Sequence, residues 1–227
     1  MAQYNLGYSS STTQAEAWAN LKTALNNYSS RLTLTYDEET YIAKAEFKEM
    51  SYYVTFRVYP DGNRLYIQIT LYDSEDAQIT QYQSNAYLEH LYLDVFEAQG
   101  DSLIFGVTTT QGDNVSTIAF VDADIPCIVI GYSNYAYIAI NNHVAQTQVA
   151  GVSQYVYSES AIQMVKVYDS TENAFIDDLY ESIIAKNVVK NFDIILASIG
   201  QRKFYLFLPV QKSGSNRWLA IECTDKF

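Results

Sequence analysis

The sequence predicts an α+β protein built mainly from antiparallel β-sheets and hairpins, with about three amphipathic helices. Three observations lead to this fold class. Runs of alternating apolar and polar residues dominate the 227-residue chain. Many of these runs flank short turn sequences, which is the pattern of β-hairpins. Three segments instead repeat apolar residues at three- and four-residue steps, and regular strand–helix–strand alternation is absent.

The first helix is expected at residues 13–28. Threonine and serine at residues 11–13 can cap its N-terminus. Its apolar stripe consists of Trp18, Leu21, Leu25 and Tyr28. Alternation then begins, so we expect a strand that starts with Leu32 and Leu34 and ends at a turn over residues 37–39, and a second strand at residues 41–47.

The clearest local signal is a hairpin around Pro60-Asp61-Gly62-Asn63. Proline presets the turn, and Asp-Gly supplies the position with positive φ. Both flanks, residues 52–59 and 64–72, are rich in aromatic and β-branched residues, as strands are. The polar residues 73–81 that follow are expected to form a loop.

A second helix is predicted at residues 85–98, with Gly100 placed for its C-terminal cap. Its apolar face would consist of Leu88, Leu91, Tyr92, Val95 and Phe96. A strand at residues 87–96 remains an alternative, because the segment is also rich in aromatic and β-branched residues.

Further hairpins, a third helix and a terminal meander complete the expected fold. The helix is predicted at residues 171–187, with Phe175, Leu179 and Ile183 on one face. The expected strands are residues 102–109, 115–121, 127–132, 135–140, 154–157, 162–168, 192–198, 203–210 and 217–223. Two regions are predicted, 1–100 and 101–227, with a boundary near Gly100 or residues 123–124; a single domain is the alternative.

Charge and segment composition narrow the class of partner. The net charge is −12, which disfavours nucleic acid and anionic membrane surfaces. Residues 1–10 have no pattern of a secretory signal, and no apolar run reaches the ~20 residues of a membrane span. We therefore expect no membrane insertion, and Cys127 and Cys223 as reduced, buried residues.

Catalytic and metal-binding motifs are missing from the sequence. His90 and His143 have no suitably spaced partner, so both are interpreted as ordinary histidines. Acidic clusters occur at residues 37–39, 73–76, 122–124 and 177–178. Asp122 and Asp124 are the most suggestive of a cation site, and a glycosidase-like pair stays open, but solvated turns explain all four clusters. We predict no enzyme, no catalytic residue, no cofactor and no metal.

Tyrosine is the most distinctive component of the chain, with 21 residues. A ring with a polar tip suits half-buried strands and protein interfaces. The candidate interface residues are Tyr132, Tyr135, Tyr137, Tyr155 and Tyr157. A place in the core is the alternative for the same side chains.

The C-terminal segment resembles proteins of phage particles and phage-tail-like machines. The resemblance lies in residues 175–180 (FIDDLY), 193–198, Gly200, 204–209 (FYLFLP) and 218–222 (WLAIE). It implies a non-enzymatic structural component of a symmetric virion assembly, formed in the bacterial cytoplasm. Its implied partners are other virion proteins and further copies of the chain, with no cofactor.

Two other functions remain open. The order of elements expected over residues 13–121 is similar to bacterial secretion-chaperone-like domains, which are acidic dimers that bind protein clients. A cytoplasmic client-binding module is therefore the first alternative. An enzyme of unrecognised type is the second.

Overall fold

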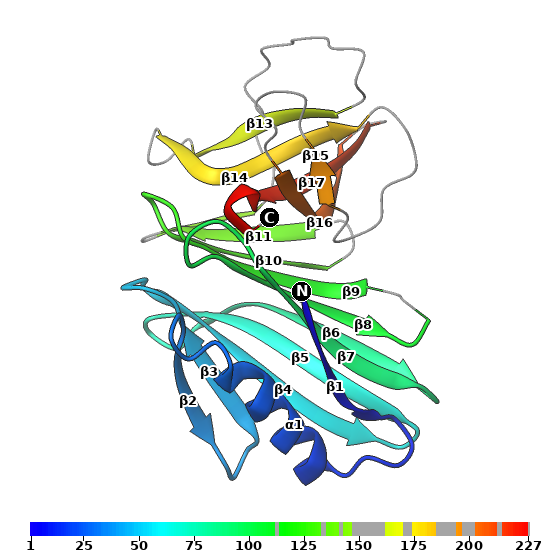
Figure 1. The fold of residues 1–227 in the computed structure, drawn as a ribbon. Helices are drawn as coiled ribbons and strands as arrows, with labels where there is room; N and C mark the ends of the chain where they lie inside the picture. The colour runs from blue at the N-terminus through cyan, green and yellow to red at the C-terminus, as the bar shows by residue number, and fades with distance from the viewer. Residues whose placement is uncertain are drawn as a thin grey trace. The chain divides into compact units, whose positions relative to one another are not determined.

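The computed structural model describes residues 1–111, 114–132, 135–140, 143–146, 162–169, 174–184, 194–196, 203–212 and 215–226 (Figure 1). Over these residues the chain forms antiparallel strands, a single α-helix and a short 3-10 helix. The prediction of an α+β protein with about three helices is therefore wrong, and the fold is mainly antiparallel β.

The chain divides into two compact units. Met1–Phe96 and Phe105–Thr117 form the first, and Glu97–Ile104 and Ile118–Phe227 the second. Strands β8 (Leu103–Thr109) and β9 (Asn114–Val121) contribute residues to both units.

The first unit contains one five-stranded sheet and part of a second sheet. The five-stranded sheet has the order β2 (Thr33–Asp37), β3 (Ile42–Glu46), β4 (Tyr52–Asp61), β5 (Arg64–Asp73) and β6 (Gln78–Tyr87). The second sheet places β1 (Ala2–Tyr8) beside β7 (His90–Glu97), followed by β8 and β9. The predicted hairpin at residues 60–63 is confirmed, with Gly62 at φ +58°. Residues 73–81 are only partly the expected loop, because β6 begins at Gln78.

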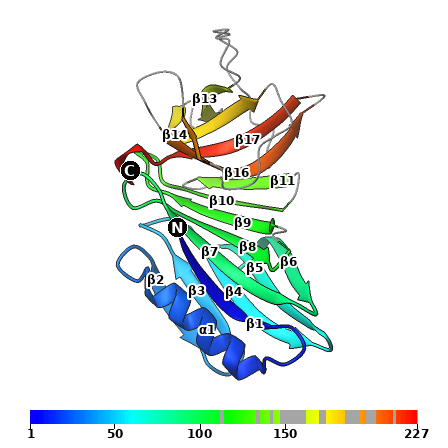
Figure 2. The ribbon, with the colours of Figure 1, turned by 45° about the vertical axis from the view of Figure 1, so that its right-hand side comes forward.

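The predicted first helix is confirmed as α1 (Gln14–Asn26). Thr13 Oγ1 accepts the Glu16 N–H, and Glu16 Oε2 accepts the Thr13 N–H at 2.8 Å, so the N-terminus has a complete capping box. The helix buries one stripe, made of Ala17, Trp18, Leu21, Ala24 and Leu25. The helix packs against β1 and β4 (Figure 2).

The predicted second helix is wrong. Residues 85–98 form the end of β6, a turn at Leu88 and then β7, which pairs with β1. The apolar residues also fit a strand, since Leu91, Leu93 and Val95 alternate and are all buried. Pairing with β1, which is far away in sequence, selects the strand over the helix.

The predicted third helix is also wrong, because residues 174–184 form β14 (Ala174–Ile184). A spacing of four residues is even, so it repeats on one face of a strand as well as on one face of a helix. Pairing with β13 (Ile162–Asp169) on one side and β17 (Ser215–Glu222) on the other selects the strand.

The second unit contains two groups of strands. Strands β9, β10 (Cys127–Tyr132), β11 (Tyr135–Ile140) and β12 (His143–Gln146) are neighbours in that order. The other sheet has the order β13, β14, β17, β16 (Lys203–Lys212) and β15 (Ile194–Leu196), which confirms the terminal meander. The short 3-10 helix η1 (Thr224–Lys226) follows β17. The strand expected at residues 154–157 lies outside the described residues. Cys127 and Cys223 are buried and are not joined in a disulfide, as predicted.

The core of the first unit lies between its two sheets. The Phe105 ring on β8 is 5.7 Å from the rings of both Phe56 on β4 and Tyr28. The hydroxyls of Ser84 on β6 and Ser116 on β9 form a buried hydrogen bond of 2.7 Å. The inner face of the five-stranded sheet is thus covered, and its outer face points the other way.

Candidate interaction surface on the five-stranded sheet

The outer face of the five-stranded sheet carries an ordered array of aromatic and polar side chains. Strand alternation puts the odd-numbered residues of β4 on this face and the even-numbered residues of β5 opposite them. We call this array the tyrosine face, and its members are Tyr53, Thr55, Arg57, Tyr59, Tyr66, Gln68, Thr70 and Tyr72. All of them except Thr70 are half-buried, so they are accessible without being loose.

Two stacked tyrosine pairs hold the two ends of the tyrosine face. The rings of Tyr53 and Tyr72 lie 5.1 Å apart at 11°. Those of Tyr59 and Tyr66 lie 5.3 Å apart at 13°. Both pairs follow directly from the hairpin register, which sets each tyrosine opposite its partner.

A cation lies near one ring of each stacked pair. Lys44 Nζ on β3 lies 3.9 Å from the ring centroid of Tyr53, and Arg57 Cζ lies 5.1 Å from that of Tyr59. Cation–π attraction of this kind fixes both partners. These contacts therefore restrict the rotamers of the array before any partner arrives.

The tyrosine hydroxyls are also held. Tyr53 donates to Asp76 Oδ1 at 2.6 Å, and the Gln83 amide donates to Tyr59 at 2.8 Å. Burial raises the pKa of Tyr53, and the hydrogen bond to Asp76 raises it further. Burial likewise raises the pKa of Tyr59. Both side chains stay protonated at neutral pH and present hydroxyl groups rather than phenolates.

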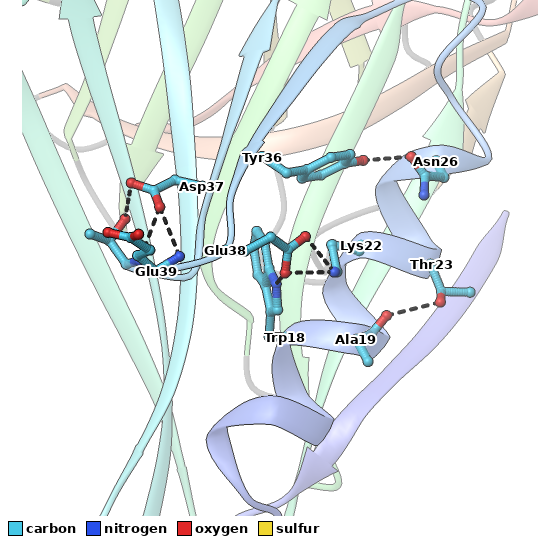
Figure 3. Close-up of polar contacts among 10 residues, drawn as sticks. Trp18, Ala19, Lys22, Thr23, Asn26, Tyr36, Asp37, Glu38 and Glu39 are labelled. Atoms are coloured by element: carbon cyan, nitrogen blue, oxygen red, sulfur yellow. Dashed lines mark hydrogen bonds and ion pairs between the residues drawn. The ribbon is translucent and has the colours of Figure 1, made fainter.

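On the opposite side of the sheet, polar contacts anchor α1 to the turn between β2 and β3 (Figure 3). Trp18 Nε1 and Lys22 Nζ both donate to the Glu38 carboxylate, each at 2.7 Å. Lys22 Nζ also lies 5.1 Å from the Trp18 ring centroid. The hydrogen bond from Lys22, followed by that from Trp18, lowers the pKa of Glu38. This carboxylate is thus committed to holding the helix.

The acidic clusters expected at turns have structural partners. Asp37 accepts hydrogen bonds from Glu39 N, Thr40 N and Thr40 Oγ1, and those from Thr40 lower its pKa most. Asp73 Oδ1 accepts from the backbone of Glu75 and Ala77. Within the described part of the chain, no three His, Cys, Asp or Glu residues are grouped as metal ligands.

The more suggestive acidic pair lies in the second unit. Asp122 Oδ2 accepts the backbone N–H of Asp101 at 2.9 Å, and its own backbone N–H donates to Ser102 Oγ. Asp122 therefore ties together the segment around Gly100. Asp124 follows in the same turn region.

His90 lies on β7, and not on the helix where it was expected. Its Nδ1 is 3.2 Å from Asn5 Oδ1, which also accepts the Gly7 N–H. Because that oxygen is an acceptor, His90 Nδ1 must carry the proton, and Nε2 holds the lone pair in the neutral ring. Tyr8 packs edge-on at 5.0 Å and Tyr92 stacks at 5.9 Å, so the ring is fixed between aromatic neighbours.

The tyrosines predicted as interface residues are only partly described. Tyr132 ends β10 and pairs directly with Tyr135 at the start of β11. Tyr137 pairs with Ile130 and is half-buried. Tyr155 and Tyr157, like the side chains of Tyr132 and Tyr135, lie outside what the structure describes.

Sequence reasoning did not select the tyrosine face. The available signal was the pattern of odd and even tyrosines on either side of the Pro60–Asn63 turn. A two-residue turn at Gly62-Asn63 fixes the register, and that register pairs Tyr59 with Tyr66 and Tyr53 with Tyr72.

Three comparisons with known proteins bear on the identity of the chain. No protein-family model matches it, and no curated protein or solved structure is significantly similar to it. In the described residues, no helix is long and apolar enough to cross a membrane. Function must therefore be argued from the surface itself.

Proposed function

We propose that this chain is a non-enzymatic structural protein that works through protein–protein contacts in a symmetric assembly. The resemblance of residues 175–222 suggests a phage or phage-tail-like particle, assembled in the bacterial cytoplasm from this chain and other virion proteins. The tyrosine face is the observation that carries the proposal.

The side chains of the tyrosine face suit protein recognition. Tyrosine and arginine are enriched among residues that dominate binding energy, because they bury large areas and lose little freedom. Here the rings are already fixed by stacking, as at Tyr53 and Tyr72. A partner would therefore bind without paying to order them.

The charge of the tyrosine face differs from that of the chain. The chain has a net charge of −12, whereas the tyrosine face contains Arg57 and no carboxylate, and the Lys44 beside it forms an ion pair with Glu46 at 2.8 Å. A neutral or acidic protein surface fits this face. The rings of Tyr53 and Tyr59 each contact both a neighbouring ring and a cation, so the ring edges are the parts most available to a partner.

The client-binding alternative loses part of its basis. It depended on a helix, strands and a second helix over residues 13–121. The second helix is strand β7. The helix α1 and the antiparallel sheet that remain are not distinctive of that class.

The proposal can be tested by adding charge to the centre of the tyrosine face. Thr55→Glu and Gln68→Glu together place a carboxylate opposite Lys44 and opposite Arg57, so cross-strand pairing should preserve the fold. The matched control, Ala15→Glu with Thr23→Glu, adds the same charge at exposed positions of α1. Circular dichroism and thermal unfolding verify that both variants fold.

The readout is assembly of the purified chain, measured by sedimentation velocity and electron microscopy over a range of concentrations. We expect the wild type and the control to form particles larger than a dimer, and the face variant to lose them. A wild type that stays monomeric and co-purifies with no particle would contradict the proposal, as would a face variant that assembles normally.

A further inference from the structure

We propose that β6 is a docking site for a second copy of the chain. In this arrangement two β6 strands pair antiparallel across a two-fold axis and join two five-stranded sheets into one ten-stranded sheet. The inference rests on the proposed function in one respect, because both require that copies of the chain associate. It names one contact of that assembly, distinct from the tyrosine face.

The first observation is that β6 is a terminal strand. It pairs with β5 along Gln78–Tyr87, and no other described strand is hydrogen-bonded to it. A terminal strand presents a row of backbone N–H and C=O groups, which another strand can pair with. The register shift opposite Tyr72 disturbs only the start of β6, so residues 80–83 are regular.

The second observation is that the core-facing side chains of β6 are poorly covered over residues 80–83. Leu71 and Ile69 on β5 are fully buried, but their partners Thr80 and Tyr82 are only half-buried. Farther along, Ser84 and Ala86 are buried again. The partly exposed stretch therefore coincides with the regular part of the edge.

The third observation is that β6 lacks the usual protection against pairing. Natural edge strands are guarded by charged residues, proline or shortness. Strand β6 has ten residues, QITQYQSNAY, with neither a charge nor a proline. The other terminal strand, β2, has five residues and ends at Asp37, directly before Glu38 and Glu39.

Charge is also the reason for choosing a second copy as the partner. Two chains of net charge −12 repel each other, and they approach at lowest cost where charge is absent. Strand β6 is such a place. Antiparallel pairing of identical strands satisfies two-fold symmetry, because residue i of one copy meets residue j of the other while j of the first meets i of the second. Glutamine, threonine and tyrosine side chains tolerate that self-contact.

The test adds positive charge to β6 of the full-length chain. Gln78→Lys with Gln81→Lys replaces two exposed side chains of β6, leaves the Gln83 bond to Tyr59 intact and reduces the net charge from −12 to −10. Overall repulsion between copies thus becomes weaker, while like charges meet locally across the two-fold axis. The matched control is Thr33→Lys with Thr35→Lys, two exposed positions on the other terminal strand.

Dimerisation is measured by sedimentation equilibrium, with hydrogen exchange as the local readout. We expect the wild type to dimerise, the β6 variant to dimerise at least about tenfold more weakly, and the β2 variant to match the wild type. Alternate amides within residues 80–83 should gain protection as the wild-type concentration rises.

Three results would overturn the inference. They are a monomeric wild type at every concentration, a dimer that the β6 variant retains, and a dimer that only the β2 variant loses. The Thr55→Glu, Gln68→Glu variant separates the two proposals. It should lose larger particles and keep the β6 dimer, so failure at the tyrosine face and failure at β6 give different outcomes.

Discussion

Strands β4 and β5, at the centre of the five-stranded sheet, have faces of opposite composition. On the inner face, Val54, Phe56 and Val58 are aliphatic or aromatic and fully buried. On the outer face, their immediate neighbours Thr55 and Arg57 are polar and half-buried. A period of two thus lets one hairpin bury one face in the core and expose the other. Each face can be disturbed separately.

The largest expected effect comes from the inner face. Phe56→Ala removes a fully buried ring packed 5.7 Å from Phe105, and should lower the free energy of unfolding by about 3–5 kcal/mol. Thr55→Ala, one residue away on the outer face, should cost less than about 1 kcal/mol. Urea unfolding of both variants tests the contrast. Similar losses for the two would mean that the faces are not energetically distinct.

The next effect is a coupling within the outer face. A double-mutant cycle of Tyr59→Ala and Tyr66→Ala should give about 0.5–1.5 kcal/mol of interaction energy, because the two rings stack at 5.3 Å. Tyr59→Ala with Tyr53→Ala, on the same strand and in different pairs, provides the control cycle and should be nearly additive. Equal coupling in both cycles would argue against discrete stacked pairs.

The hairpin of β4 and β5 was predictable because its signals are local. Pro60-Asp61-Gly62 defines the turn, and alternation over ten residues defines each strand. The capping residue Thr13 and the stripe of Trp18, Leu21 and Leu25 similarly identified α1. These features depend on residues close in sequence, so propensity and pattern suffice.

The failures concern segments whose apolar spacing satisfies two periods. Phe175, Leu179 and Ile183 lie four apart, which suits both a helix and a strand. The choice was made by pairing with residues far away in sequence, such as Leu179 with Ile221. The tyrosine face was missed for a related reason. Its chemistry lies in cross-strand stacking, whereas strand alternation in the sequence favoured the tyrosines between residues 132 and 157.

A smaller effect is expected where the five-stranded sheet ends. Leu88 has φ +53° and is 49% exposed, in the turn that leads from β6 to β7. This conformation costs a leucine about 1–2 kcal/mol, and glycine gives back about 0.5–1 kcal/mol through the flexibility of the unfolded chain. Leu88→Gly should therefore stabilise the chain by about 0.5–1 kcal/mol in thermal unfolding. A loss of stability would show that the exposed leucine contributes contacts that outweigh its strain.

The smallest effect concerns how the inner face is kept covered by α1, and it depends on pH. The bonds from Lys22 and Trp18 lower the pKa of Glu38 in the folded chain. As pH falls below about 4.3, the ordinary value for glutamate, the unfolded chain takes up its proton first. The stabilisation from Glu38 is thus complete above that pH and is lost as pH falls through the lowered folded value.

The variant Glu38→Gln should remove this part of the acid sensitivity. Its stability should lie below that of the wild type at pH 7, and the gap should narrow steadily towards pH 3. Urea unfolding at several pH values in low salt measures the gap, since salt screens an exposed ion pair. The control is Glu49→Gln, an exposed glutamate between β3 and β4, which should keep the wild-type slope. If the unfolding free energy of Glu38→Gln changes with pH as much as that of the wild type, the charge of Glu38 does not anchor α1. Packing of Trp18 would then explain the anchoring.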